Sequence, residues 1–158
     1  MEAECNKLVK TDRVTWGSCM VACGDADGMV AGNTRHYAAT VDKLMQSIGS
    51  RDDEIVFGLC VFVNRGRTIV IADTNVIEYP TSEELASIAK SSARVAKLLG
   101  LDPKIAFLSH STFGQPETDR TKRISKAVEM LKDEKVDFLF DGEMQPDVAL
   151  NNKYKGTY

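Results

Sequence analysis

The stretch IAFLSHSTFG, residues 105–114, says more about the fold than any other part of the chain. Its first four residues are apolar and predict a buried strand, and a helical pattern resumes near Thr118. In open α/β sheets, ligands bind beyond the carboxyl ends of strands, where helix N-termini offer N–H groups to anions. The turn Ser109–Gly114 is therefore a candidate ligand site, but a Ser-x-Ser-Thr turn also occurs for structural reasons alone.

Two further β-rich runs end in small polar clusters. Residues 68–72 lead into Asp73-Thr74-Asn75, and residues 136–140 lead into Asp141-Gly142-Glu143. If these strands are parallel, the clusters line one edge of the sheet. The alternative is that Asp73, like Thr81, only caps a helix.

Periodicity places helices around these strands. We expect them at residues 14–23, 38–48, 82–99 and 117–133, with a last one starting near residue 145. Residues 55–63 and 68–72, joined by the turn Asn64–Arg67, predict an antiparallel hairpin. The order of elements predicts an α/β fold with α/β/α layers and a mostly parallel mixed sheet. Residues 1–13 form a polar segment, loose or an incomplete helix; residues 14–150 form a partial domain, and residues 151–158 a tail.

The two longest helices have apolar faces, and the first also has a clear start signal. Thr81 followed by Glu84 predicts a capping box at the first. The inward positions are Leu85, Ile88, Ala89, Ser92, Ala96 and Leu99 in the first helix, and Ile124, Val128 and Leu131 in the second. Basic residues of the second helix, Lys122, Arg123, Lys126 and Lys132, predict a solvated face.

Composition narrows the class of protein. The 158 residues, 43% hydrophobic and 27% charged, are typical of one globular domain. A net charge of -3 argues against a general nucleic-acid binder, and no apolar run is long enough to span a bilayer. We expect a cytoplasmic protein with four reduced cysteines. No metal site is expected, because only two histidines exist and neither has ligand spacing to Cys19 and Cys23.

Five motifs together resemble the phosphate acetyl/butyryl transferase (phosphotransacetylase) family, from about Val14 to Leu150. They are GDADGMVAG (24–32), IADT (71–74), PTSEELA (80–86), LSHSTFG (108–114) and DGEMQ (141–145). The resemblance implies a layered fold of the phosphotransacetylase and isocitrate-dehydrogenase type. The family's domain extends beyond both ends of this chain, and its later Ser-Arg-Gly stretch and acidic residue would lie past Tyr158.

Within the family, the chain is more similar to the C-terminal domain of bacterial multifunctional NADP-malic enzymes than to stand-alone phosphotransacetylases. His36-Tyr37 stands where transacetylases have a Ser-Thr pair, and Asp42 stands where they have a phosphate-binding arginine. Phe113 takes a position that is commonly basic in them. If the register slips by one residue, Arg35 could supply the cation.

The resemblance implies a regulatory and oligomerisation domain that binds acetyl-CoA or CoA and forms homo-oligomers, without nucleic acid or membrane partners. No cofactor is expected in this segment, whereas the parent malic enzyme would use NADP and a divalent metal. The alternatives are a phosphate acetyltransferase, which moves acetyl between CoA and phosphate, and a scaffold without a ligand. No catalytic residue is assigned. The expected ligand-binding residues are Thr34, Arg35, Asp73, Ser109, Ser111, Thr112, Gly114, Asp141 and Glu143.

Overall fold

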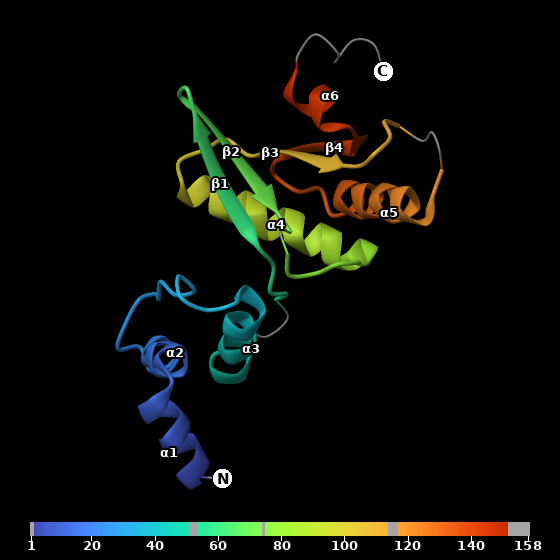
Figure 1. The fold of residues 1–158 in the computed structure, drawn as a ribbon. Helices are drawn as coiled ribbons and strands as arrows, with labels where there is room; N and C mark the ends of the chain where they lie inside the picture. The colour runs from blue at the N-terminus through green and yellow to red at the C-terminus, as the bar shows by residue number, and fades with distance from the viewer. Residues whose placement is uncertain (1, 51–53, 74, 114–116, 152–158) are drawn as a thin grey trace. The chain divides into compact units, whose positions relative to one another are not determined.

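The computed structural model describes residues 2–50, 54–73, 75–113 and 117–151 (Figure 1). They belong to two compact units, Met1–Glu54 and Ile55–Tyr158. The described part of the first unit contains helices α1 (Glu2–Thr11), α2 (Arg13–Cys23) and α3 (Tyr37–Ser47). The polar segment at residues 1–13, for which two alternatives stood open, therefore contains a ten-residue helix.

Helices α2 and α3 are held together by a close polar contact. The hydroxyl oxygens of Ser18 on α2 and Ser47 on α3 lie 2.6 Å apart, and Ser18 is fully buried. Gly17 leaves room for the chain that follows α2, since a Cβ there would lie 2.6 Å from Sδ of Met29. The hydroxyl contact and the close approach at Gly17 therefore both contribute to the local packing of the first unit.

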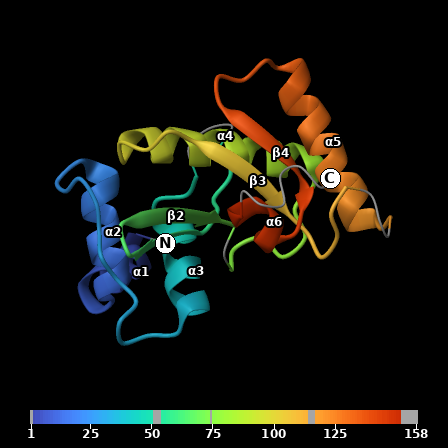
Figure 2. The same ribbon diagram turned by 90° about the horizontal axis from the view of Figure 1, so that it is seen from above.

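The second unit begins with the predicted hairpin. Strand β1 (Leu59–Asn64) pairs antiparallel with β2 (Arg67–Ala72), and Phe62 lies opposite Ile69. The predicted strand was too long at its start, because residues 55–58 precede β1. Strands β3 and β4 form a separate parallel pair, side by side in Figure 2. The remaining bounds are α4 (Ser82–Leu98), β3 (Lys104–Leu108), α5 (Asp119–Asp133), β4 (Leu139–Met144) and α6 (Pro146–Leu150).

Helices α4 and α5 lie on one side of the β3–β4 pair, and α6 lies on the other (Figure 1). This arrangement confirms the α/β class. The core between the sheet and the two long helices is apolar and consists of Ala86, Ala89, Phe107, Ile124, Ala127, Val128 and Leu131. Burial of these side chains is the main stabilising contribution in the second unit.

The capping box at α4 is confirmed, since the Thr81 hydroxyl accepts from the Glu84 N–H and the Glu84 carboxylate accepts from the Thr81 N–H. The inward stripe was wrong at Leu99. That side chain is 51% exposed, because α4 ends at Leu98 and Leu99 forms its C-terminal cap. Ile124, Val128 and Leu131 are buried as expected.

The position of Asp141 and Glu143 differs from the prediction. Both were expected in a loop after a strand at residues 136–140, but they lie within β4. The ladder continues because Asp141 pairs with Ala106 and Gly142 with Phe107. Gly142 permits this close approach, since a Cβ there would lie 2.7 Å from the Phe107 side chain.

Candidate ligand-binding site

The loop after β3 runs back along β4. The Ser109 N–H donates to the Met144 carbonyl at 2.9 Å, and the Phe113 N–H donates to the Glu143 carbonyl at 3.0 Å. The Gln145 side-chain amide donates to the His110 carbonyl at 2.7 Å. Backbone bonds at both ends and an amide in the middle therefore fix the loop against the strand.

Ser111 and Glu143 form the buried centre of this site. The Ser111 hydroxyl donates to Oε1 of Glu143 at 2.9 Å, and each residue is only 2% exposed. A buried carboxyl group is costly unless it is hydrogen-bonded, so this contact supports the position of both residues. The structure thus brings together two predicted ligand residues that lie on neighbouring elements.

Thr112 is positioned differently. Its Oγ1 accepts from the Gln145 N–H at 3.1 Å, which leaves the hydroxyl hydrogen able to donate to another group. Thr112 is also partly exposed, unlike Ser111. Gln145 was not among the predicted site residues, although it ends the DGEMQ motif and contacts both Thr112 and His110.

Asp141 lies at a pocket between the β3–β4 pair and α6. Its side chain is exposed, and Oδ1 accepts from the Gly142 N–H at 2.9 Å. The pocket has a volume of about 360 Å³ and is mostly apolar, lined by Lys104, Ile105, Ala106, Phe113, Leu139, Phe140, Asp141, Met144, Val148 and Ala149. An apolar ligand group would fit beside the Asp141 carboxylate.

Asp73 follows β2, a strand of the antiparallel hairpin. Burial raises the pKa of its carboxyl group, and nearby Glu84 raises it further, whereas a bond from the Ile77 N–H lowers it. Its Oδ1 is buried without a hydrogen-bond partner in the described part of the chain. Among the described strands only β3 and β4 pair in parallel, so the grouping of Asp73 with their polar clusters stays a prediction. Gly114 lies outside the described residues.

Thr34 and Arg35 are exposed residues of the first unit. The Arg35 guanidinium forms an ion pair with Asp12, a contact that sequence reasoning missed. Asp12 is the N-cap of α2, and a bond from the Thr15 N–H, followed by Arg35, lowers the pKa of its carboxyl group to about 2. That Thr34 and Arg35 face the loops of the second unit stays a prediction.

The described residues contain no group of three histidine, cysteine, aspartate or glutamate side chains able to hold a metal ion. No disulfide bond joins the four cysteines, which all lie among the described residues. No helix among the described residues is long and apolar enough to cross a membrane. The polar contacts at the β3–β4 site are made by hydroxyl, amide and carboxylate groups.

The profile of the phosphate acetyl/butaryl transferase family matches residues 1–157. This chain belongs to that family. It is 45% identical over 152 residues to an NADP-dependent malic enzyme of Rhizobium meliloti, covering 96% of this chain but 20% of the relative. It is 33% identical to a phosphate acetyltransferase of Bacillus subtilis, covering 87% of this chain and 43% of that protein.

The structural comparison agrees with the family. A phosphotransacetylase structure from Streptococcus pyogenes matches with a TM-score of 0.74 and 32% identity. The match covers 89% of this chain and 46% of that chain. The family member described here therefore spans a fifth of the malic enzyme and less than half of each transacetylase.

Proposed function

We propose that this chain is an acetyl-CoA-binding regulatory and oligomerisation domain of an NADP-dependent malic enzyme. The parent enzyme would oxidatively decarboxylate malate to pyruvate in the cytoplasm, using NADP and a divalent metal. The higher identity to the Rhizobium malic enzyme, 45% against 33% for the Bacillus phosphate acetyltransferase, supports this choice.

The main support for ligand binding is the orientation of the Thr112 hydroxyl group. It is oriented by the Gln145 N–H and still has a hydrogen to donate. An acetyl carbonyl or phosphate oxygen is a suitable acceptor for it. The mostly apolar pocket that includes Phe113 and Asp141 would take a neighbouring apolar part of the ligand.

Binding without turnover fits the residues better than catalysis does. Transfer of acetyl from sulfur to phosphate needs a base near the thiol. The Ser111 hydroxyl already donates to Glu143, and His110, the imidazole of the loop, is exposed beside Ser109. Asp42, at the position where transacetylases are expected to have an arginine, lies exposed on α3.

Calorimetric titration of the chain with acetyl-CoA tests the proposal. A neutral hydrogen bond contributes about 0.5–1.5 kcal/mol, so Thr112→Val should weaken binding about two- to tenfold, whereas Thr112→Ser should keep it. If Arg35 binds a phosphate, Arg35→Ala should weaken binding about ten- to a hundredfold, because charged hydrogen bonds contribute about 1.5–3 kcal/mol. Lys126→Ala, on the exposed face of α5, is the control. Absence of saturable binding by the parent chain would contradict the proposal.

The second candidate is a phosphate acetyltransferase, favoured by the family match and by the solved phosphotransacetylase. The discriminating assay measures acetyl phosphate formed from acetyl-CoA and phosphate. Robust turnover, lost on Thr112→Val, would establish this second function and reject a purely regulatory domain. We expect none above the uncatalysed rate.

Oligomerisation is the remaining part of the proposal. Exposed apolar side chains support it, including Trp16 on α2 at 55% and Phe62 and Val63 on β1 at 53% and 73%. The apolar segment Val14–Met20 is a candidate interface, in which Trp16 is exposed and Val14 is buried. Light scattering should detect dimers or larger species at micromolar concentration. A monomer at all concentrations would contradict this part without affecting ligand binding.

A further inference from the structure

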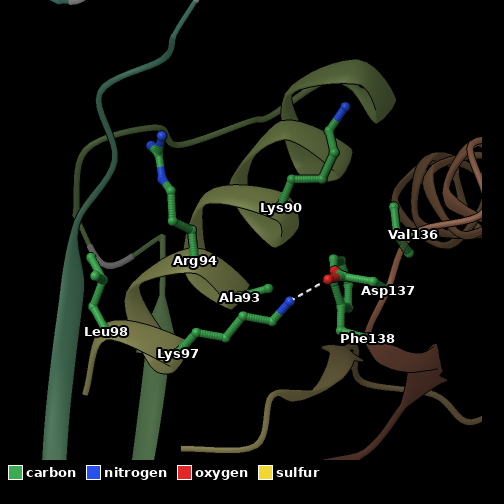
Figure 3. A pocket seen from close by; sticks show the side chains of 8 residues that line it. All are labelled: Lys90, Ala93, Arg94, Lys97, Leu98, Val136, Asp137 and Phe138. Atoms are coloured by element: carbon green, nitrogen blue, oxygen red, sulfur yellow. Dashed lines mark hydrogen bonds and ion pairs between the residues drawn. The ribbon is translucent and has the colours of Figure 1, made fainter. Parts of the chain in front are cut away.

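A second pocket lies at the opposite end of β4 from the Ser111–Glu143 contact. It is formed by the C-terminal half of α4 and by residues 136–138, which lead into the amino end of β4 (Figure 3). Its volume is about 480 Å³, and its lining consists of Lys90, Ala93, Arg94, Lys97, Leu98, Val136, Asp137 and Phe138. Nothing in the proposed function uses this pocket.

The α4 pocket is locally positive in an acidic protein. Lys90, Arg94 and Lys97 follow one another at helical spacing, and Asp137 is the single carboxylate in the lining. Glu134 pairs with Lys90, so three cations stand against two carboxylates in this region. The whole chain, by contrast, has a net charge of -3. This local excess of cations is complementary to an anion.

The ion pairs that Lys97 and Lys90 form are weak enough for a ligand anion to replace the protein carboxylate. Lys97 reaches toward Asp137 (Figure 3). Its Nζ lies 2.5 Å from Oδ2 of Asp137. The two side chains are 44% and 80% exposed, and surface ion pairs of this kind contribute little net stability. Lys90 is similarly paired with Glu134 at 2.8 Å. A carboxylate or sulfonate of a ligand can therefore take the place of Asp137 beside Lys97.

The rest of the lining is apolar and partly rigid. Phe138 packs edge to face with Phe140, their ring centroids 5.9 Å apart, and both contact the core. Ala93 lies on the floor, while Leu98 is 82% exposed at the rim. Such a lining suits a ligand that has an apolar body as well as an acid group.

We propose that the α4 pocket binds a small amphipathic organic anion. Its acid group lies against Lys97 and Lys90, and its apolar body lies against Val136, Phe138 and Leu98. A purely polar anion would leave the apolar wall in water, and a neutral ligand would gain nothing from the lysines. Both parts of the ligand are thus required for binding.

Fluorescence titration of the full chain with 8-anilinonaphthalene-1-sulfonate, an amphipathic sulfonate, tests the charge requirement. Lys97→Gln should weaken binding about two- to fivefold, the range expected for one exposed ion pair. Asp137→Asn should strengthen binding, because it removes the competing carboxylate. Lys126→Gln is the matched control, since Lys126 is also exposed and paired, with Glu83 at 2.8 Å. The neutral analogue N-phenyl-1-naphthylamine should respond equally in all variants.

Amide chemical-shift mapping with the same sulfonate tests the location. The resonances of Ala93, Leu98 and Phe138 should move, and those of Ser111 and Glu143 should not. Equal affinity of Lys97→Gln and Lys126→Gln would overturn the proposal. So would shifts confined to the exposed apolar residues of β1, which would mean that the probe binds the hairpin instead.

Discussion

Ser111 and Glu143 are joined by a 2.9 Å hydrogen bond in which the serine hydroxyl donates to the carboxyl group, and both residues are almost completely buried. Ser111→Ala removes this donor from a buried carboxyl group. We expect a loss of about 1–3 kcal/mol in the free energy of unfolding, the cost of leaving such a group without its partner. Urea unfolding followed by circular dichroism measures it.

Ser125→Ala is the control for this prediction. Ser125 is exposed on α5, where the same substitution should change stability by less than about 0.5 kcal/mol. Equal stability of the two variants would show that the Ser111–Glu143 bond is not needed to hold the loop on β4.

Leu131 on α5 has no exposed surface and packs in the core of the second unit. Leu131→Ala should lower the free energy of unfolding by about 2–5 kcal/mol, because the substitution removes apolar packing and leaves a cavity. Leu98→Ala makes the same chemical change at a side chain that is 82% exposed. Thermal unfolding of the two variants should therefore differ clearly, and similar melting temperatures would contradict the assigned core.

The capping box of α4 provides a local test. Thr81→Ala removes the acceptor for the Glu84 N–H, which lies 3.2 Å from the hydroxyl oxygen. The expected loss is about 0.5–2 kcal/mol. Thr81→Ser keeps the oxygen and should restore most of the stability in denaturant titrations. If the serine variant is as unstable as the alanine variant, the threonine methyl group, and not the cap, is responsible.

Helix positions could be predicted well from the sequence because their signals are local. The Thr81–Glu84 box and the spacing of Ile124, Val128 and Leu131 are visible within a few residues. The hairpin could also be predicted, because the residues Asn64–Arg67 favour a tight turn. In the structure, Arg65 and Gly66 of this turn have positive φ angles of 47° and 76°.

The site depended on longer-range contacts that no local pattern contains. A strand was expected to end before Asp141, since Asp and Gly usually interrupt strands. Pairing with Ala106 and Phe107 instead extended β4 through both residues and buried Glu143. Ser111, in the loop after β3, contacts Glu143 of β4. That these polar residues bind a ligand stays a prediction.

The carboxyl group of Asp12 should make the stability of the fold depend on pH. The Thr15 N–H and Arg35 lower the pKa of its carboxyl group from 3.8 to about 2 in the folded state. A lowered pKa means that the ionised carboxylate is stabilised by folding. This contribution is complete above about pH 4 and is lost as the pH falls through about 2.

Nuclear magnetic resonance titration of the Asp12 carboxyl carbon measures this directly. Arg35→Ala should raise the pKa of Asp12 but leave it below 3.8, because the bond from the Thr15 N–H is the larger cause and remains. Lys126→Ala, in the second unit, should leave the titration unchanged. An unaltered midpoint in Arg35→Ala would mean that the Arg35–Asp12 pair does not form in solution. Arg35 would then be unconstrained by Asp12, and the cost of moving it to a ligand phosphate would be correspondingly smaller.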